Sequence, residues 1–529
     1  MKRAALLIAL LASCSAHAAD ARRPADVLIR GGLVYTGAEA DPKIVDVVLV
    51  GDKVAYVGDD AASRFNPAHT IDAQGKIVAP GFIDPHTHPD SYIRSKDPAQ
   101  RRNAPWLMQG VTTIGIGVDG GGSFEVAKQR AWFEGRGVGT NLAAYVGFDP
   151  VRESVLGQQA RAPNAQELTR MRQRVAQAMC EGAFGFSTGL FYAPQSFART
   201  DEVVALAHEA GTRGGIYDTH QRDESSYGIG LLDSTREAID IGRQAGLPVH
   251  IAHLKALGVD VHGRARDLVS IIEAARASGV NVTADQYPFV ASSSSLQASL
   301  LPSWSVEGGR AALVNRLHDP ATLPRIKTEM AENLRRRGGA DSLLFNSTGR
   351  PWSGKTLAAM ATTWRVEPVD AALRVIGDGN NDEAGSVTSF NMDPEDVKLL
   401  MRQPWVVTGS DGSDGHPRQY ATFPEKYAKY VEHDKVLTTA EFIRRSTGLT
   451  ADILSLDRRG YLRPGYFADV VVLDPAAYRP KADYLHPAVL SVGVIDLWIN
   501  GELAVDAGKP TDGLFGRVLS HVPTAGTCQ

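Results

Sequence analysis

Three features are scarce in this sequence: cysteine, an excess of positive charge, and long apolar runs. Among the 529 residues the cysteines are Cys14, Cys180 and Cys528, so a structural disulfide is possible but not indicated. The formal net charge of −4 gives no electrostatic reason to expect a nucleic-acid partner. Beyond residue 20, no stretch approaches the ~18 consecutive apolar residues that a membrane-spanning helix needs, so we expect no transmembrane segment. The remaining composition, 43% hydrophobic and 22% charged, is typical of a globular protein with a large core.

Residues 1–18 have the pattern of a secretory signal peptide. Lys2 and Arg3 precede an apolar run from Ala4 to Ala12, and the small residues of Ala16-His17-Ala18 suit cleavage. We therefore expect an exported protein, either periplasmic or secreted. An alternative stays open, because Leu11-Ala12-Ser13-Cys14 resembles a bacterial lipobox, which would anchor the protein through a lipid on Cys14.

Short β-rich runs occupy both ends of the chain and differ from the middle. Near the N-terminus they are separated by Gly51-Asp52 and Gly58-Asp59-Asp60, which favour hairpin turns, and similar runs return from residue 469 onward. We expect one small β-sandwich domain with an N-terminal part at 19–78 and a C-terminal part within 436–529. The region 79–435, together with a last helix after 436, alternates between strand and helix patterns, as a parallel α/β fold does.

Eight apolar runs in this middle region predict a (β/α)₈ barrel of the TIM type, with helices such as 164–181 and 200–212 between them. The segment between the seventh and eighth predicted strands is longer than a single crossover helix needs. It contains an insertion at about 290–355, after the seventh strand, which is interpreted either as a lid over the barrel mouth or as a surface excursion. The glycine-rich stretch 412–418 leaves the last strand, where loops line active sites.

Histidine and aspartate side chains stand at the ends of the apolar runs, which is where barrel enzymes place their reactive groups. His86 and His88 are separated by one residue, so in an extended segment they point to the same side and suit a cation such as Zn²⁺. A lone histidine is more often structural, and the odd spacing of His250 from His253 places His250 on the other face. Six coincident placements predict a metal centre, whose candidate ligands are His86, His88, Asp119, His220, His253 and Asp411.

Several motifs resemble a known group of enzymes. His86-Thr87-His88, the histidines that close two later strands and Gly409-Ser410-Asp411 are similar to the amidohydrolase superfamily of metal-dependent hydrolases. Over nearly the whole chain after the leader, the sequence resembles the N-acyl-D-amino-acid deacylases, or D-aminoacylases. The stretches that carry this resemblance are 182–190, 251–255, Ser410-Asp411-Gly412 with His416-Pro417-Arg418, and 460–469.

The sequence departs from the deacylase pattern at one candidate ligand. Those deacylases carry a cysteine ligand in a Gly-Asn-Cys-Gly context, whereas the matching stretch here is Gly117-Val118-Asp119-Gly120. Asp119 is the inferred replacement, and its carboxylate is a harder ligand that can bridge two ions. Other members of the superfamily bridge two metals with a carboxylated lysine on the fourth strand. Because no lysine occurs between Lys128 and Lys255, that design is excluded here, which weakens a hydantoinase-like or dihydroorotase-like reading.

The resemblance implies a hydrolase with one or two Zn²⁺ ions that deacylates N-acyl-D-amino acids, small molecules with a free carboxylate, and the leader adds that it is exported. Asp411 would be the catalytic proton-transfer group as well as a ligand. Lys255, Tyr287 and Arg418 match positions that hold the substrate's α-carboxylate. The alternatives are a peptidase acting on D-residue or isoaspartyl-type dipeptides, a cyclic amidase of the same superfamily, or a non-catalytic envelope protein that binds a metal or ligand. The oligomeric state is left open, and a monomer is compatible with the sequence.

Overall fold

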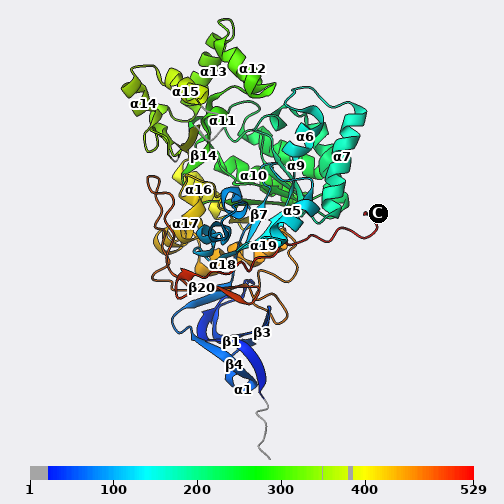
Figure 1. Ribbon diagram of the computed structural model, residues 1–529, viewed down its shortest axis with the longest axis vertical. Helices are drawn as coiled ribbons and strands as arrows, with labels where there is room; N and C mark the ends of the chain where they lie inside the picture. Colours follow the sequence, from blue (N-terminus) through cyan, green and yellow to red (C-terminus); the bar gives the residue numbers. More distant parts are fainter. Residues whose placement is uncertain (1–21, 348, 379–384, 529) are drawn as a thin grey trace, which may run out of the picture.

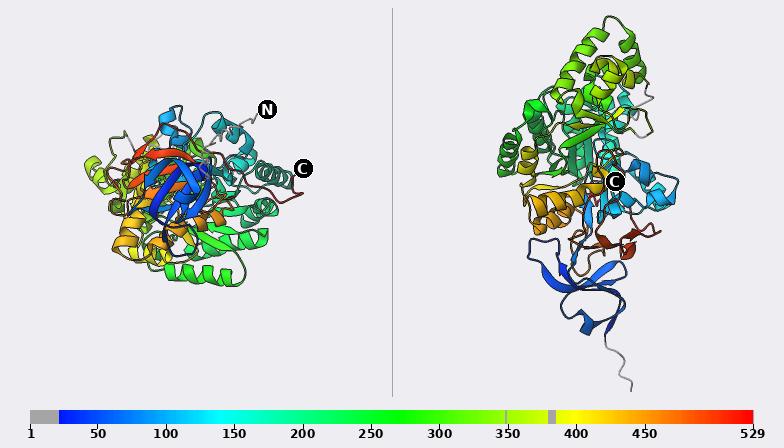
Figure 2. Two further views of the ribbon diagram at one scale, coloured as in Figure 1. Left: turned by 90° about the horizontal axis from the view of Figure 1, so that it is seen from below. Right: turned by 90° about the vertical axis from the view of Figure 1, so that its left-hand side faces the viewer.

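The computed structural model describes residues 22–347, 349–378 and 385–528 (Figure 1). The predicted signal peptide and Cys14 lie outside these residues. A β domain forms one end of an elongated molecule, the barrel lies in the middle, and the helices α12 to α15 form the opposite end (Figures 1 and 2). Within the described residues, no helix combines the length and the apolar character needed to cross a membrane.

Strands from both chain ends pair in one sheet, which confirms the predicted β domain. Its order is β21-β20-β19-β18-β5-β1-β2-β3, with β4 beside β1. Alternate apolar side chains of these strands form a core that includes Ile29, Val47 and Trp498. The strands are β1 (Arg23–Val34), β2 (Lys43–Val50), β3 (Lys53–Gly58), β4 (Phe65–Asp72), β5 (Ile77–Pro80), β18 (Val470–Leu473), β19 (Val494–Ile499), β20 (Glu502–Asp506) and β21 (Lys509–Pro510).

One of the two expected hairpins is absent from this domain. Gly51-Asp52 joins the antiparallel strands β2 and β3, as predicted. Gly58-Asp59-Asp60 instead leads into the short helix α1 (Ala61–Arg64), after which β4 runs parallel to β1. The carboxylate of Asp60 pairs with Arg64 one turn later, at 2.7 Å, which favours a helical turn at this point.

Eight parallel strand positions form the barrel and confirm the predicted fold class. The hydrogen-bonded series are β6-β7-β8 and β17-β13-β12-β11-β10-β9, and β8 and β9 lie in succession along the third position. A parallel bridge between Thr87 and Gly412 joins the first strand to the last, and the amide of Asp411 donates to the carbonyl of His86 at 2.9 Å. The strands are β6 (Phe82–Asp84), β7 (Val111–Ile116), β8 (Asn141–Ala144), β9 (Val146–Gly147), β10 (Gly185–Gly189), β11 (Ile216–His220), β12 (Val249–Ile251), β13 (Val282–Gln286) and β17 (Val406–Thr408).

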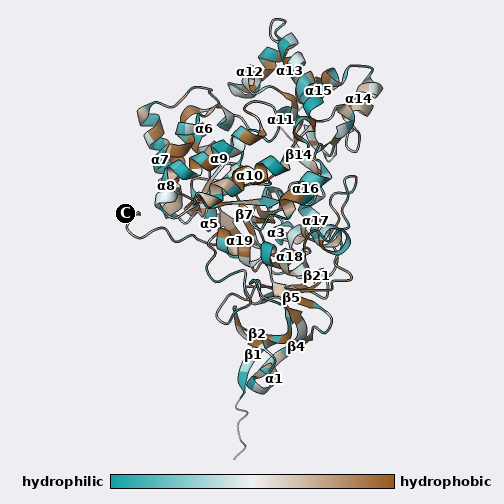
Figure 3. Ribbon diagram, turned by 180° about the vertical axis from the view of Figure 1, so that it is seen from behind, coloured by the Kyte–Doolittle hydropathy of each residue, from teal (hydrophilic) through white to brown (hydrophobic). Residues whose placement is uncertain are grey.

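Helices surround the barrel and turn their apolar faces toward the strands (Figure 3). The helix α7 lies within the helix predicted at 164–181 and begins with a capping box between Asn164 and Glu167. The helices of this layer are α2 (Asp90–Ile93), α3 (Pro98–Arg101), α4 (Ala104–Leu107), α5 (Val126–Glu134), α6 (Phe148–Leu156), α7 (Ala165–Cys180), α8 (Thr200–Thr212), α9 (Leu231–Ala245), α10 (Ala265–Ala277), α16 (Pro394–Met401), α17 (Arg418–Glu425), the π-helix Lys426–His433, α18 (Thr439–Ser446) and α19 (Gly448–Ile453).

The insertion after β13 is a unit with its own core. It contains a three-stranded sheet of order β14-β16-β15 and an apolar cluster that includes Leu296, Ile326 and Trp352. It continues to residue 390, past the expected end near 355, because α14 and α15 pack on this core rather than on the barrel. The elements are β14 (Ala291–Ser295), α11 (Leu296–Leu300), α12 (Gly309–His318), α13 (Leu323–Arg336), β15 (Leu343–Phe345), α14 (Leu357–Trp364), α15 (Pro368–Asp378) and β16 (Ser386–Phe390).

The C-terminal segment runs back along the barrel and is held there by a disulfide. The amide of Leu142 at the third strand donates to the carbonyl of Arg517 at 2.9 Å, and the amide of His521 donates to the carbonyl of Gly182 at 3.0 Å. Cys528 then bonds to Cys180 at the end of α7. The disulfide that the sequence left open is therefore present.

Candidate metal centre

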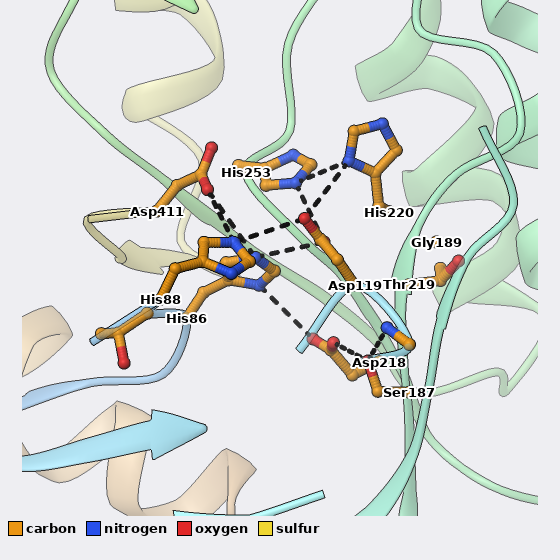
Figure 4. Close-up of polar contacts among 12 residues, drawn as sticks. His86, His88, Asp119, Ser187, Gly189, Asp218, Thr219, His220, His253 and Asp411 are labelled. Atoms are coloured by element: carbon orange, nitrogen blue, oxygen red, sulfur yellow. Dashed lines mark hydrogen bonds and ion pairs between the residues drawn. The ribbon is translucent and has the colours of Figure 1, made fainter. Parts of the chain in front are cut away.

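The six predicted ligands converge at the carboxyl ends of the barrel strands (Figure 4). His86 and His88 follow β6, Asp119 follows β7, His220 ends β11, His253 follows β12 and Asp411 follows β17. Their potential ligand atoms form two groups, each within 4.8 Å, which share Asp119. The first group is His86, His88, Asp119 and Asp411, and the second is Asp119, His220 and His253.

Ring nitrogens and carboxylate oxygens face a common space in this cluster. Oδ1 of Asp119 lies 3.2 Å from Nε2 of His86 and 3.4 Å from Nε2 of His253. Oδ2 of Asp119 lies 3.4 Å from Nε2 of His88 and 3.7 Å from Nδ1 of His220. Nδ1 of His220 and Nε2 of His253 approach to 3.0 Å.

Buried polar atoms in the cluster support metal binding. Oδ1 of Asp119 and both ring nitrogens of His86 are buried, and within the described residues none of them makes a well-aligned hydrogen bond. Native proteins normally satisfy buried polar atoms, so lone pairs that face one centre in this way suit a cation. The set of imidazoles and carboxylates fits Zn²⁺ and similar divalent ions.

The carboxylates of the cluster also favour positive charge at its centre. Burial opposes protonation of His88, but the carboxylates of Asp119 and Asp411 outweigh it and raise the pKa of His88 to about 10. Burial and the ammonium of Lys255 oppose protonation of His253, yet Asp411 and the other nearby carboxylates raise the pKa of His253 to about 10. Without a metal the cluster therefore holds protons that a metal ion would displace.

Three of the candidate ligands have strained backbones. Asp119, His253 and Asp411 have φ angles of 52°, 36° and 49°, in the left-handed region. Such residues cost roughly 1–3 kcal/mol each and persist where surrounding contacts hold them. The amide of His253 donates to Oδ1 of Asp285 at 3.1 Å, and the amide of Asp411 donates to the carbonyl of His86. The sharp turn after each strand directs the side chain toward the centre.

His250 lies apart from the cluster, in the barrel interior. Its Nδ1 lies 2.9 Å from Oγ1 of Thr283, and its Nε2 lies 3.0 Å from Oδ2 of Asp285. Both ring nitrogens thus have partners, which fits a structural role, although His250 shares Asp285 with the backbone of His253 and does not lie on the opposite side from the centre, as its spacing had suggested.

Two buried carboxylates beneath the centre were missed in the sequence. Oδ1 of Asp218 lies 4.0 Å from Nδ1 of His86, and Oδ2 of Asp218 accepts from Ser187 at 2.9 Å. Asp285 holds the backbone of His253, as described above. Asp218 precedes His220 by two residues in β11, so strand alternation could have placed both side chains on one face.

The three predicted carboxylate-binding residues lie next to one another, and two of them, Lys255 and Arg418, line the cavity of the site. Arg418 begins α17, and its Nη1 lies 2.6 Å from Oδ2 of Asp411. The guanidinium of Arg418 is 5.2 Å from the ring centroid of Tyr287, and Nζ of Lys255 is 5.7 Å from the same ring. Nζ of Lys255 also contacts Oε1 of Glu224 at 2.7 Å, Nδ1 of His253 at 2.7 Å and the carbonyl of His253 at 3.0 Å. The structure thus brings the three together and adds Glu224, which the sequence did not indicate.

A cavity of about 1350 Å³ opens above the cluster. His88, Asp119 and Asp411 line its floor, and residues of the insertion, among them Trp304 and Arg336, line its outer part. The insertion therefore borders the cavity, as a lid would.

Comparisons with known proteins agree with this geometry. The sequence model of the amidohydrolase family matches residues 69–505. D-aminoacylase of Alcaligenes xylosoxydans xylosoxydans is 31% identical over 94% of this chain and 98% of that protein. The crystal structure of a D-aminoacylase that defines a novel subset of amidohydrolases has a TM-score of 0.79 at 29% identity, with 94% of this chain and 100% of that chain covered. The N-acyl-D-glutamate deacylase of Bordetella bronchiseptica, solved with zinc and a phosphonate inhibitor, has a TM-score of 0.78 at 29% identity and the same coverage.

Proposed function

This chain belongs to the amidohydrolase family, and from that premise we propose that it is an exported, zinc-dependent deacylase of N-acyl-D-amino acids. The resemblance to the N-acyl-D-amino-acid deacylases is confirmed by the D-aminoacylase relative, which is 31% identical over 94% of the chain. The protein is accordingly an enzyme, a metal-dependent amidohydrolase acting on carbon–nitrogen bonds other than peptide bonds. The proposed products are a carboxylate and a free D-amino acid.

Metal binding in this proposal uses the six convergent residues: His86, His88, Asp119, His220, His253 and Asp411. Two ligand groups that share Asp119 provide for one ion or two. Zinc is favoured by the mixture of imidazole and carboxylate donors, and the deacylase of Bordetella bronchiseptica was solved with zinc. A bound divalent cation would polarise the scissile carbonyl and acidify a water molecule.

One observation carries the choice of substrate: Asp411 lies between the other candidate metal ligands and Arg418. Its Oδ1 is 3.2 Å from Nε2 of His88, and its Oδ2 is 2.6 Å from Nη1 of Arg418. In an N-acyl amino acid the scissile nitrogen and the α-carboxylate are attached to the same carbon. A group that protonates this nitrogen must therefore lie next to the group that holds the carboxylate, which is the arrangement of Asp411 and Arg418.

The side chains then have distinct tasks. Asp411 takes a proton from the attacking water and delivers it to the departing amine nitrogen. Arg418 offers a planar guanidinium for the α-carboxylate, and the buried ring of Tyr287 lies beside both Arg418 and Lys255. The insertion, which borders the cavity, reduces the access of bulk water to the reacting amide.

Export is proposed from the leader sequence and is supported by the disulfide between Cys180 and Cys528. Structural disulfides persist in oxidising compartments and are rare in the cytosol. A periplasmic or secreted protein fits both observations, and a lipid on Cys14 is the alternative. Mass spectrometry of the protein recovered from its host distinguishes the two, because cleavage after residue 18 removes Cys14 and lipidation retains it as the modified first residue.

The test of function is an activity screen after metal removal and reconstitution with zinc. N-acetyl-D-amino acids, their L-enantiomers, cyclic amides and D-residue dipeptides are supplied in parallel, and the released amine is measured. We expect zinc-dependent hydrolysis of the D-series alone. Cleavage of cyclic amides or dipeptides, with both acetylated series untouched, would replace the proposal with one of the alternative activities.

A further inference from the structure

Glu224 is a buried carboxylate that lies between two candidate ligands, His220 and His253, and the predicted substrate-binding residue Lys255. It lies in the loop that follows β11, and 5% of its side chain is exposed. The loop is held by Asp223, whose carboxylate accepts from the amides of Ser225 and Gly228 at 2.8 and 2.6 Å. Glu224 is therefore presented by a rigid turn, as a precise contact requires.

The two oxygens of Glu224 face the outer nitrogens of two different histidines. Oε1 lies 3.2 Å from Nδ1 of His253, whose Nε2 is the nitrogen that faces Asp119. Oε2 lies 3.7 Å from Nε2 of His220, whose Nδ1 faces Asp119. His253 thus presents one nitrogen to the centre and the other to Glu224 at hydrogen-bonding distance, and His220 does so at a longer, ion-pair distance.

We propose that Glu224 is a positioning residue that fixes the tautomer and ring orientation of His253 and, through its longer contact, favours the matching tautomer of His220. A carboxylate facing the outer nitrogen stabilises a proton there, which leaves the lone pair of the inner nitrogen free for a cation. The inference rests on the proposed metal centre and is independent of the proposed substrate.

The same arrangement affects Lys255. Its ammonium has three N–H donors, and the structure places three acceptors around them: Oε1 of Glu224, Nδ1 of His253 and the carbonyl of His253. Once Nδ1 of His253 carries a proton it cannot accept from Lys255. One donor of Lys255 is then released beside the cavity that Lys255 lines, where a substrate carboxylate can receive it. Glu224 thereby links the histidine ligands to Lys255, one of the residues proposed to bind the substrate's carboxylate.

The test measures metal affinity and compares two buried glutamates. Glu224→Gln keeps the size of the side chain but loses its charge, and we expect zinc affinity to fall about ten- to a hundredfold, as for other carboxylates behind metal-bound histidines. The control is Glu202→Gln, because Glu202 is also buried and pairs with Arg152 at 3.1 Å on the outer helix α8. We expect the control to lower the unfolding temperature and leave zinc affinity unchanged.

Zinc per chain is measured after dialysis against graded chelator, and the absorption spectrum of the cobalt-substituted protein reports ligand geometry. Parent-like affinity and an unchanged cobalt spectrum in Glu224→Gln would overturn the inference, and so would an equal loss of zinc in Glu202→Gln. If Glu224→Gln does not fold, Glu224→Asp serves instead, since it keeps the charge but is too short to reach both histidines. That variant should also lose zinc affinity, and parent-like zinc affinity in it counts against the role. A parent enzyme that binds zinc yet hydrolyses no N-acyl-D-amino acid would refute the proposed function and leave this test intact.

Discussion

Replacing Arg418 by lysine separates its two possible tasks, which are to hold a substrate carboxylate and to hold Asp411. Arg418 is 2% exposed, and its guanidinium lies 2.6 Å from Oδ2 of Asp411 and donates through Nη2 to Oγ of Ser413 at 3.1 Å. Lysine keeps the charge but loses the planar, two-pronged donor set. A charge-assisted hydrogen bond contributes about 1.5–3 kcal/mol, so the loss of one should lower kcat/KM roughly ten- to a hundredfold for a substrate with a free carboxylate.

The assay compares an N-acetyl-D-amino acid with the same molecule capped as an α-amide. The parent should hydrolyse the capped substrate slowly, because its carboxylate is missing, and Arg418→Lys should barely change that slow rate. A second expectation concerns Asp411. Burial alone would raise the pKa of Asp411, but Arg418, followed by His253 and His88, lowers it well below its usual range. Since lysine preserves the charge, Asp411 should stay ionised and the acidic limb of the pH profile should not move. Equal losses on acid and capped substrates would refute the reasoning and assign Arg418 to the support of Asp411 or of the loop.

Four further expectations concern the centre and the C-terminal segment. Asp411→Asn should keep the fold and most of the metal while kcat falls by about 10² or more; near-normal turnover in a metal-replete variant would remove Asp411 from its proton-transfer role. Asp119→Ala should lower the zinc content, and Asp119→Cys should retain zinc, whereas parent-like zinc in the alanine variant after dialysis would exclude Asp119 as a ligand. Because the pKa values of His88 and His253 are raised to about 10, zinc must displace protons when it binds. The affinity of the protein for zinc should therefore increase with pH, by about tenfold per displaced proton and pH unit. Calorimetry that detects no proton release on zinc binding would contradict this. Cys180→Ser should lower stability by about 2–4 kcal/mol and speed proteolysis of 516–528, and an unchanged digestion pattern would show that the hydrogen bonds alone hold that segment.

The barrel and its six candidate ligands could be predicted because one physical rule places them. Parallel strands in a barrel all end at the same rim, so a polar residue directly after each apolar run meets the others in space. His220 ends β11 and Asp411 follows β17, far apart in the sequence, yet the strand pattern alone was sufficient to bring them together.

Contacts that depend on loops could not be predicted in the same way. Glu224 lies beyond the end of β11, where no periodic pattern shows which way a side chain points. The pairing of Cys180 with Cys528 depends on the path of an irregular C-terminal segment over a separation of 348 residues. The contact between Arg418 and Asp411 likewise depends on the turn of the 412–418 loop, so the sequence indicated a role for Arg418 but not its second partner.

The aspartate at position 119, where the resemblance implies a cysteine, is explained by its backbone and its two oxygens. With a φ of 52°, Asp119 occupies the left-handed region, which aspartate tolerates better than most residues. Oδ1 faces His86 and His253, and Oδ2 faces His88 and His220, so each oxygen meets one histidine from each of the two ligand groups. A thiolate would offer a single sulfur atom to both groups. The carboxylate spreads its charge over two donor atoms, and this suits a position that has to serve two groups of ligands at once.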